Sequence, residues 1–124
     1  MKILVVDDEK DIQVLFEQKF RKEIKNNEIE FVFACSGEEA LVCLQKYQHE
    51  AVLILSDINM PGMSGLELLK NIKQKHRVPP PIVMMITAYG DPENYNQAME
   101  LGADDFITKP VDFNLLKEKI KTLS

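Results

Sequence analysis

Short continuous apolar runs alternate along the chain with longer segments in which apolar residues recur at every third or fourth position. The continuous runs predict strands that are buried on both faces of a parallel sheet. The spaced pattern, as in Ile12, Phe16 and Phe20, predicts amphipathic helices. The expected strands cover residues 2–6, 28–34, 51–56, 81–87 and 104–108.

Signals for helix starts and stops follow these strands. The sequences Ser36–Glu39 and Ser64–Glu67 have the Ser-x-x-Glu spacing of a capping box. Asp91 and Asp112 are the expected N-caps of the last two helices. The prolines of "VPPP" (78–81) stop the helix before the fourth strand. Five strand–helix units in succession predict an α/β fold with a doubly wound, five-stranded parallel sheet and five helices on its two faces.

Polar side chains stand directly after four of the expected strands. Asp7 and Asp8 follow the first strand, Asp57 follows the third, the fourth ends in Thr87 and the fifth leads to Lys109. Any one of them has an ordinary structural explanation, as a turn or cap residue, a strand residue or a surface lysine. Because ligands of open α/β sheets bind beyond the carboxyl ends of the strands, their joint placement predicts one functional site.

The charges of these side chains indicate what the site holds. Three carboxylates and one ammonium leave two negative charges, which a divalent cation would neutralise. Oxygen ligands without His or Cys favour Mg2+, with Mn2+ as an alternative. Such a site suits phosphoryl transfer, in which a carboxylate can serve as the nucleophile. Asp57, which stands alone after the most apolar strand, is the better candidate for the phosphoryl acceptor. The adjacent Asp7 and Asp8 are the better candidates for metal ligands. The residues alone do not decide between these roles.

Length and composition narrow the function classes. The chain has 124 residues, a net charge of −5 and a sequence pI of about 5.0. This length suits one domain, and the acidic balance argues against broad binding to nucleic acid or to acidic membranes. Cys35 and Cys43 lack the spacing of a zinc site. No apolar run has membrane-spanning length and the start is not a signal peptide, so we expect a cytoplasmic protein.

Several quoted segments together resemble a known family. Asp7-Asp8, "DINMPGMSG" (57–65), "TA" (87–88) and "GADDFITKP" (102–110) resemble the receiver domain of two-component response regulators. The resemblance covers essentially the whole chain, and the spacing is similar to that of the stand-alone chemotaxis receiver. It implies a flavodoxin-like sheet with strand order 2-1-3-4-5, an order that the residue pattern does not itself determine.

The resemblance implies an acceptor and a set of metal ligands. Asp57 would accept a phosphoryl group from a sensor histidine kinase, a phosphotransfer protein or a small phosphodonor. Asp8 and Asp57 would ligate Mg2+ directly, and Asp7 would help through water. The backbone carbonyl of Asn59 would complete the protein ligands. Asn59 and Tyr89 match positions that in the family tune the loss of phosphate.

The resemblance also implies a switch. Thr87 would hydrogen-bond one phosphoryl oxygen and Lys109 would pair with another, while Phe106 would fill the space behind the moving threonine. Phe106 lacks the hydroxyl of the family's common tyrosine, so only its burial can bias the switch. The Lys109–Pro110 peptide bond would be cis. The readout face would be the fourth helix, fifth strand and fifth helix, residues 91–123, which would bind a downstream protein or a fused output domain.

These expectations amount to one receiver domain over residues 1–124, without an output domain, a nucleic-acid contact or a membrane contact. It would promote only its own phosphorylation and dephosphorylation and would not be an enzyme in the usual sense. A flavin protein is disfavoured because the loop "DDEKD" would repel phosphate. A haloacid-dehalogenase-type phosphohydrolase needs spaced aspartates and a lid. A pseudo-receiver that is never phosphorylated should lack a pocket residue, and none is missing.

Overall fold

The computed structural model describes residues 1–46, 51–74, 81–88 and 92–123, and for Ala51, Val52 and Ala88 the backbone alone. The expectations for Tyr89, for Asp91 as a helix cap and for the prolines at 79 and 80 lie outside the described residues. None of the helices in the described segments is long and apolar enough to span a membrane.

The strands form one parallel sheet with the order β2-β1-β3-β4-β5. This order confirms the doubly wound topology expected from the resemblance. Each strand lies within two residues of a predicted apolar run. The bounds are β1 Lys2–Val6, β2 Glu30–Ala34, β3 Ala51–Asp57, β4 Ile82–Ala88 and β5 Asp105–Lys109.

Six helices occur in the described segments, where the sequence pattern predicted five. The predicted apolar spacing from Ile12 to Phe20 corresponds to the helix Lys10–Lys19, and an unpredicted short helix follows Phe20, whose backbone angles of φ −107° and ψ 19° are not helical. Phe20 keeps the helical spacing in sequence, and its ring is fully buried among other phenylalanines. The bounds are α1 Lys10–Lys19, α2 Arg21–Lys25, α3 Gly37–Lys46, α4 Gly65–Gln74, α5 Pro92–Glu100 and α6 Phe113–Lys121.

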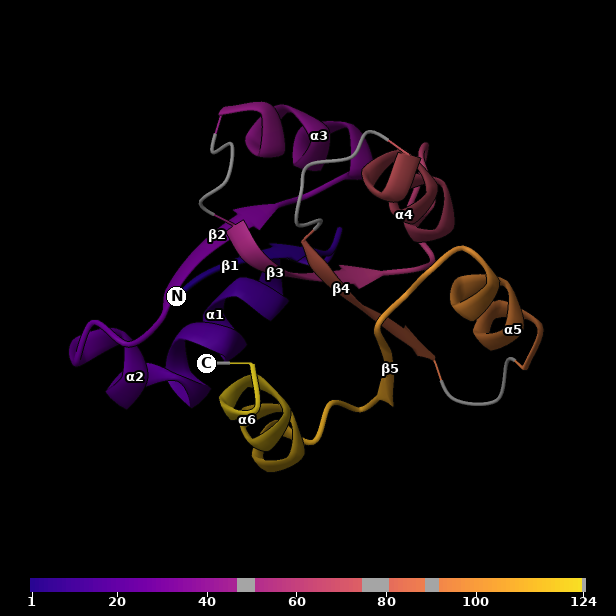
Figure 1. Ribbon diagram of the computed structural model, residues 1–124. Coiled ribbons are helices and arrows are strands. Elements are labelled where there is room, and N and C mark those ends of the chain that lie inside the picture. Colours follow the sequence, from indigo (N-terminus) through magenta and orange to yellow (C-terminus); the bar gives the residue numbers. More distant parts are fainter. Residues whose placement is uncertain (47–50, 75–80, 89–91, 124) are drawn as a thin grey trace.

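The helices cover both faces of the sheet (Figure 1). Helices α3, α4 and α5 pack on one face, and α1, α2 and α6 pack on the other. Successive strand side chains point to opposite faces, so Leu4 and Val6 enter the first core whereas Ile3 and Val5 enter the second. Burial on both faces explains why the strands appear as unbroken apolar runs.

Three predicted helix caps are present. The Ser36 Oγ accepts a hydrogen bond from the Glu39 backbone N–H at 3.0 Å, and Ser64 accepts one from Glu67 at 3.2 Å. Asp112 caps α6 by accepting hydrogen bonds from two backbone N–H groups. These contacts satisfy donors that the first helical turn leaves unpaired.

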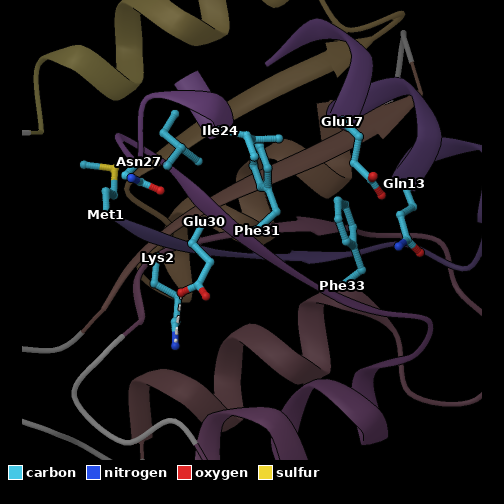
Figure 2. A pocket seen from close by; sticks show the side chains of 10 residues that line it. Met1, Lys2, Gln13, Glu17, Ile24, Asn27, Glu30, Phe31 and Phe33 are labelled. Atoms are coloured by element: carbon cyan, nitrogen blue, oxygen red, sulfur yellow. Dashed lines mark ion pairs between the residues drawn. The ribbon is translucent and has the colours of Figure 1, made fainter. Parts of the chain in front are cut away.

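A groove of about 920 Å3 lies beside the edge strand β2. Figure 2 shows Phe31 and Phe33 of β2, Gln13 and Glu17 of α1, and further lining side chains from the chain start and the end of α2. None of the polar residues predicted to form the site lines this groove. The candidate chemistry therefore lies elsewhere, at the carboxyl ends of the strands.

Candidate functional site

The strand order brings the predicted site residues together. Strands β1, β3, β4 and β5 are successive neighbours, and all of them run in the same direction. Asp7 directly follows β1, Asp57 ends β3, Thr87 lies near the end of β4 and Lys109 ends β5. Four segments that are distant in sequence therefore place their polar side chains along one edge of the sheet.

Three carboxylates form an acidic cluster at this edge. One oxygen from each of Asp7, Asp8 and Asp57 lies within 4.8 Å of the others. Asp57 and Asp7 are only 5% and 8% exposed, whereas Asp8 is exposed. Like charges held this close repel one another, and a hard divalent cation prefers such an all-oxygen donor set. The donor set therefore fits Mg2+, with Asp8 on the solvent side.

The ammonium group of Lys109 contacts two members of the cluster. Its Nζ lies 3.3 Å from Oδ2 of Asp57 and 3.4 Å from Oδ2 of Asp7. The carboxylate of Glu9 is further away, at 4.0 Å. Lys109 therefore offsets part of the charge of the two buried aspartates.

Burial and the neighbouring charges shift two pKa values in the site. Burial raises the pKa of the Asp57 carboxyl, and the Asp7 carboxylate raises it further, although Lys109 and the backbone of Asn59 oppose the change. Burial works against the charged form of Lys109, but the carboxylates of Asp57 and Asp7 outweigh it and raise the Lys109 pKa. Lys109 therefore stays positively charged beside Asp57, and burial and the Asp7 charge make ionisation of the Asp57 carboxyl unfavourable.

Thr87 presents a buried hydroxyl without a partner. The residue is 1% exposed, and its Oγ1 has no hydrogen-bond partner among the described residues. A buried hydroxyl without a partner costs free energy. An oxygen-rich ligand at this edge of the sheet could supply the missing partner.

Phe106 lies in β5 and packs against the core beneath α3, α4 and α5. Its ring meets the ring of Tyr95 edge to face, with centroids 5.0 Å apart and planes at 79°. Tyr95 belongs to α5 and is 46% exposed. The aromatic side chain at the position resembling the family's switch is thus covered by a second aromatic ring at the surface.

The remaining predicted residues are placed as follows. Asn59 is exposed in the loop after β3, and the role of its carbonyl as a metal ligand stays a prediction. The Lys109–Pro110 peptide bond is cis, the geometry that the resemblance implied.

Sequence reasoning gave no role to Gly65, which determines how the chain leaves Asp57. A methyl group built on Gly65 would lie 2.0 Å from the backbone oxygen of Asp57, and the Gly65 N–H donates to Ile58 O at 2.8 Å. Only a glycine allows this approach of two backbones. A glycine eight positions after the aspartate was the available signal, but sequence does not show the contact.

Comparisons with known proteins agree with this geometry. The profile of the response regulator receiver domain matches residues 3–121. The chain therefore belongs to the family of response regulator receiver domains, which are regulatory domains of two-component systems.

Two relatives illustrate the similarity in sequence. The chain is 39% identical to response regulator protein PilR of Pseudomonas aeruginosa over 121 residues, which are 98% of this chain and 25% of PilR. It is 36% identical to response regulator RR06 of Streptococcus pneumoniae over 124 residues, 99% of this chain and 52% of RR06. The chain thus spans between a quarter and about half of these relatives.

The solved structures support the same fold. Chemotaxis protein CheY4 of Vibrio cholerae superposes with a TM-score of 0.83 at 27% identity, covering 99% of this chain and 98% of CheY4. A response regulator receiver domain protein of Clostridium thermocellum gives a TM-score of 0.85 at 30% identity, covering 98% of this chain and 92% of that one. These values confirm the flavodoxin-like arrangement.

Proposed function

We propose that this chain is a phosphoacceptor switch that acts in the cytoplasm, with Asp57 as the residue that is phosphorylated. The observation that carries the proposal is the set of contacts around Asp57. A buried carboxylate lies among two others within 4.8 Å and contacts the Lys109 ammonium at 3.3 Å. This arrangement provides a nucleophile, a cation to pair with an incoming phosphoryl group, and oxygen ligands for a divalent metal.

The proposed reaction is transfer of a phosphoryl group to the Asp57 carboxylate. The donor is the phosphohistidine of a sensor kinase or phosphotransfer protein, or a small acyl phosphate. An Asp57 oxygen forms a bond to phosphorus while the bond to the donor nitrogen or oxygen breaks, and the donor leaves with that electron pair. Asp7, Asp8, Asp57 and the carbonyl of Asn59 would hold Mg2+, which when bound neutralises charge on the transferring group. Hydrolysis of the acyl phosphate by water restores Asp57.

The proposed switch begins at the two groups that face the new phosphate. Lys109 pairs with one phosphoryl oxygen, and the Thr87 hydroxyl, which has no partner among the described residues, donates to another. Phosphorylation adds about −1.5 to −2 charges and strong acceptor oxygens. As Thr87 moves, Phe106 fills the space behind it, which changes the surface formed by α5, β5 and α6. This surface would contact the downstream protein or an output domain.

Intact-mass spectrometry tests the proposal directly. Wild type and Asp57→Asn are incubated with acetyl phosphate, with and without Mg2+. We expect one phosphoryl adduct on the wild type that requires Mg2+ and is absent from the variant. Beryllofluoride, which mimics a bound phosphoryl group, is added to a parallel sample to detect an adduct that is lost too quickly. Absence of both the adduct and a beryllofluoride-induced spectral change would favour a pseudo-receiver that acts only through protein contacts.

A further inference from the structure

The loop that follows Asp57, residues 58–64, is called here the acceptor loop, and a side chain of α3 holds it. Oε1 of Glu38 accepts a hydrogen bond from the Met63 backbone N–H at 3.3 Å. The second oxygen, Oε2, lies over Gly62, where an added methyl group would be 2.9 Å away from it. The Glu38 carboxylate therefore covers the Gly62–Met63 peptide with both oxygens.

The backbone of the acceptor loop is shaped for this contact. Gly62 has φ +74°, a conformation that other residues rarely adopt. The side chain of Met63 packs against Gly37 so closely that a methyl group there would lie 2.9 Å from its Cγ and Sδ. The far end of the acceptor loop is thus fitted to the first turn of α3 by a hydrogen bond and by packing.

The near end of the acceptor loop is fixed independently. The Gly65 N–H donates to the Ile58 carbonyl at 2.8 Å, which closes the base of the loop. Met60 is 9% exposed and belongs to the core beneath α3, α4 and α5. Asn59, whose carbonyl is the proposed metal ligand, therefore lies in a segment anchored by its base, by Met60 and by Glu38.

We infer that Glu38 is a positioning residue of the metal site, which sets the direction of the Asn59 carbonyl by holding the acceptor loop. The inference rests on the proposed function, in which that carbonyl is a ligand of Mg2+. Groups that orient a metal ligand without touching the metal change its affinity, because a misdirected ligand must be reordered on binding.

A simpler role for Glu38 predicts a different result. A carboxylate in the first turn of a helix is stabilising through its interaction with the helix dipole, wherever it points. Glu39 is the next residue of the same turn and is also exposed, and the hydrogen bond near it uses its backbone N–H. Glu39→Ala therefore removes the same charge from the same turn and leaves the acceptor loop untouched.

The test compares the full chain as wild type, Glu38→Ala, Glu38→Gln and Glu39→Ala. Hydrogen exchange followed by NMR measures protection of the Met63 amide, and titration with MgCl2 at constant ionic strength measures the Kd for Mg2+. Glu38→Gln keeps an acceptor oxygen without the charge. If Glu38→Ala does not fold, Glu38→Asp replaces it, because a side chain one methylene shorter lengthens the 3.3 Å contact with the Met63 amide.

We expect Glu38→Ala to accelerate exchange of the Met63 amide and to raise the Kd for Mg2+ by about tenfold, the lower end of such effects. The Kd for Mg2+ of Glu38→Gln and of Glu39→Ala should stay within about twofold of the wild-type value. An unchanged Kd in Glu38→Ala, or an equal rise in Glu39→Ala, would overturn the inference and leave the proposed function standing. A wild type that binds no Mg2+ and forms no phosphoryl adduct would overturn both.

Discussion

The backbone of Gly65 faces the carbonyl of Asp57 so closely that a methyl group on Gly65 would lie 2.0 Å from that oxygen. The first residue of α4 thus supports the backbone of the proposed phosphoacceptor from behind. The side chain of the same residue contacts the Lys109 ammonium at 3.3 Å, so Asp57 is held through both its backbone and its carboxylate.

This contact predicts that Gly65→Ala is destabilising. The added methyl group must push apart two buried backbones, and overpacking of this kind costs about 1–3 kcal/mol. Urea denaturation measures the free energy of unfolding, with Lys70→Ala, an exposed position of the same helix, as the control. A Gly65→Ala protein as stable as the control would show that the turn relaxes without cost.

The acidic cluster predicts that Asp57→Asn is stabilising in metal-free buffer at neutral pH. Burial and the Asp7 carboxylate raise the pKa of Asp57, so the folded state holds the proton more tightly than the unfolded state does. Ionisation of Asp57 therefore lowers stability as pH rises through the two pKa values. The gain in Tm should be present at pH 7 and vanish below the ordinary carboxyl pKa of 3.8. Asp11→Asn, at an exposed position of α1, should give no such gain, and a lower Tm for Asp57→Asn would contradict the argument.

The same repulsion predicts that Mg2+ raises the Tm of the wild type. A ligand that binds only the folded state stabilises it in proportion to the logarithm of its concentration. The increase should be smaller in Asp57→Asn, which has lost one carboxylate of the cluster. NaCl at equal ionic strength serves as the control, because general screening also reduces repulsion. An equal response to MgCl2 and NaCl would count against a metal site.

The buried hydroxyl of Thr87 predicts that Thr87→Val is stabilising in the unphosphorylated protein. The described part of the chain offers this hydroxyl no partner, and replacing such a buried hydroxyl with a methyl group removes a desolvation cost of about 1–3 kcal/mol. Thr108 is the neighbour of Thr87 in the β4–β5 register and is exposed, so Thr108→Val should change the free energy of unfolding little. A lower free energy of unfolding for Thr87→Val, with no change for Thr108→Val, would mean that the Thr87 hydroxyl has a hydrogen-bond partner in solution.

The ion pair between α2 and α6 predicts a pH-dependent effect of Glu23→Gln. Lys117 Nζ lies 3.2 Å from Oε2 of Glu23. Burial alone would raise the pKa of Glu23, but its own backbone, Lys117 and Lys22 together hold the pKa below 4.5. A lowered carboxyl pKa contributes stability that is present above the unfolded pKa and lost as pH falls through the folded one.

Glu23→Gln should therefore lower the free energy of unfolding by about 0.5–1 kcal/mol at neutral pH, the scale of a partly exposed pair. The difference from the wild type should shrink as the buffer is made acidic. Urea denaturation across this range tests the expectation, with the exposed Glu28→Gln as the control. A difference that is independent of pH would assign the effect to packing instead of charge.

The fold could be predicted from local patterns because each element carries its own signal. The strands are buried on both faces, so their sequences are unbroken apolar runs, and Ser36, Ser64 and Asp112 cap helices where the spacing indicated. The short helix α2 was not predicted, and the apolar spacing that ends at Phe20 did not show that this residue leaves the helical conformation. Burial of its ring among aromatic side chains from β2 and α6 is a tertiary effect that local spacing does not contain.

For the candidate site, the sequence predicted which residues take part but not how they contact one another. Sequence could name Asp7, Asp57 and Lys109, because every parallel strand delivers its last residues to the same edge. It could not show that one ammonium contacts two of the carboxylates, since that depends on strand order. The roles of Gly65 and Glu38 were not predicted, because both residues act through contacts with backbone atoms. In the sequence they are only a glycine and an exposed acid, and residue type does not reveal such contacts.

The sheet divides the interior into two cores, and within the described segments no helix contributes to both. Phe106 enters the core beneath α5, while the next residue, Ile107, enters the one beneath α6. A displacement that starts at the acidic edge therefore reaches these two helices through separately packed interiors. Strand β5 contributes side chains to both, so its backbone links the residues that face α5 to those that face α6.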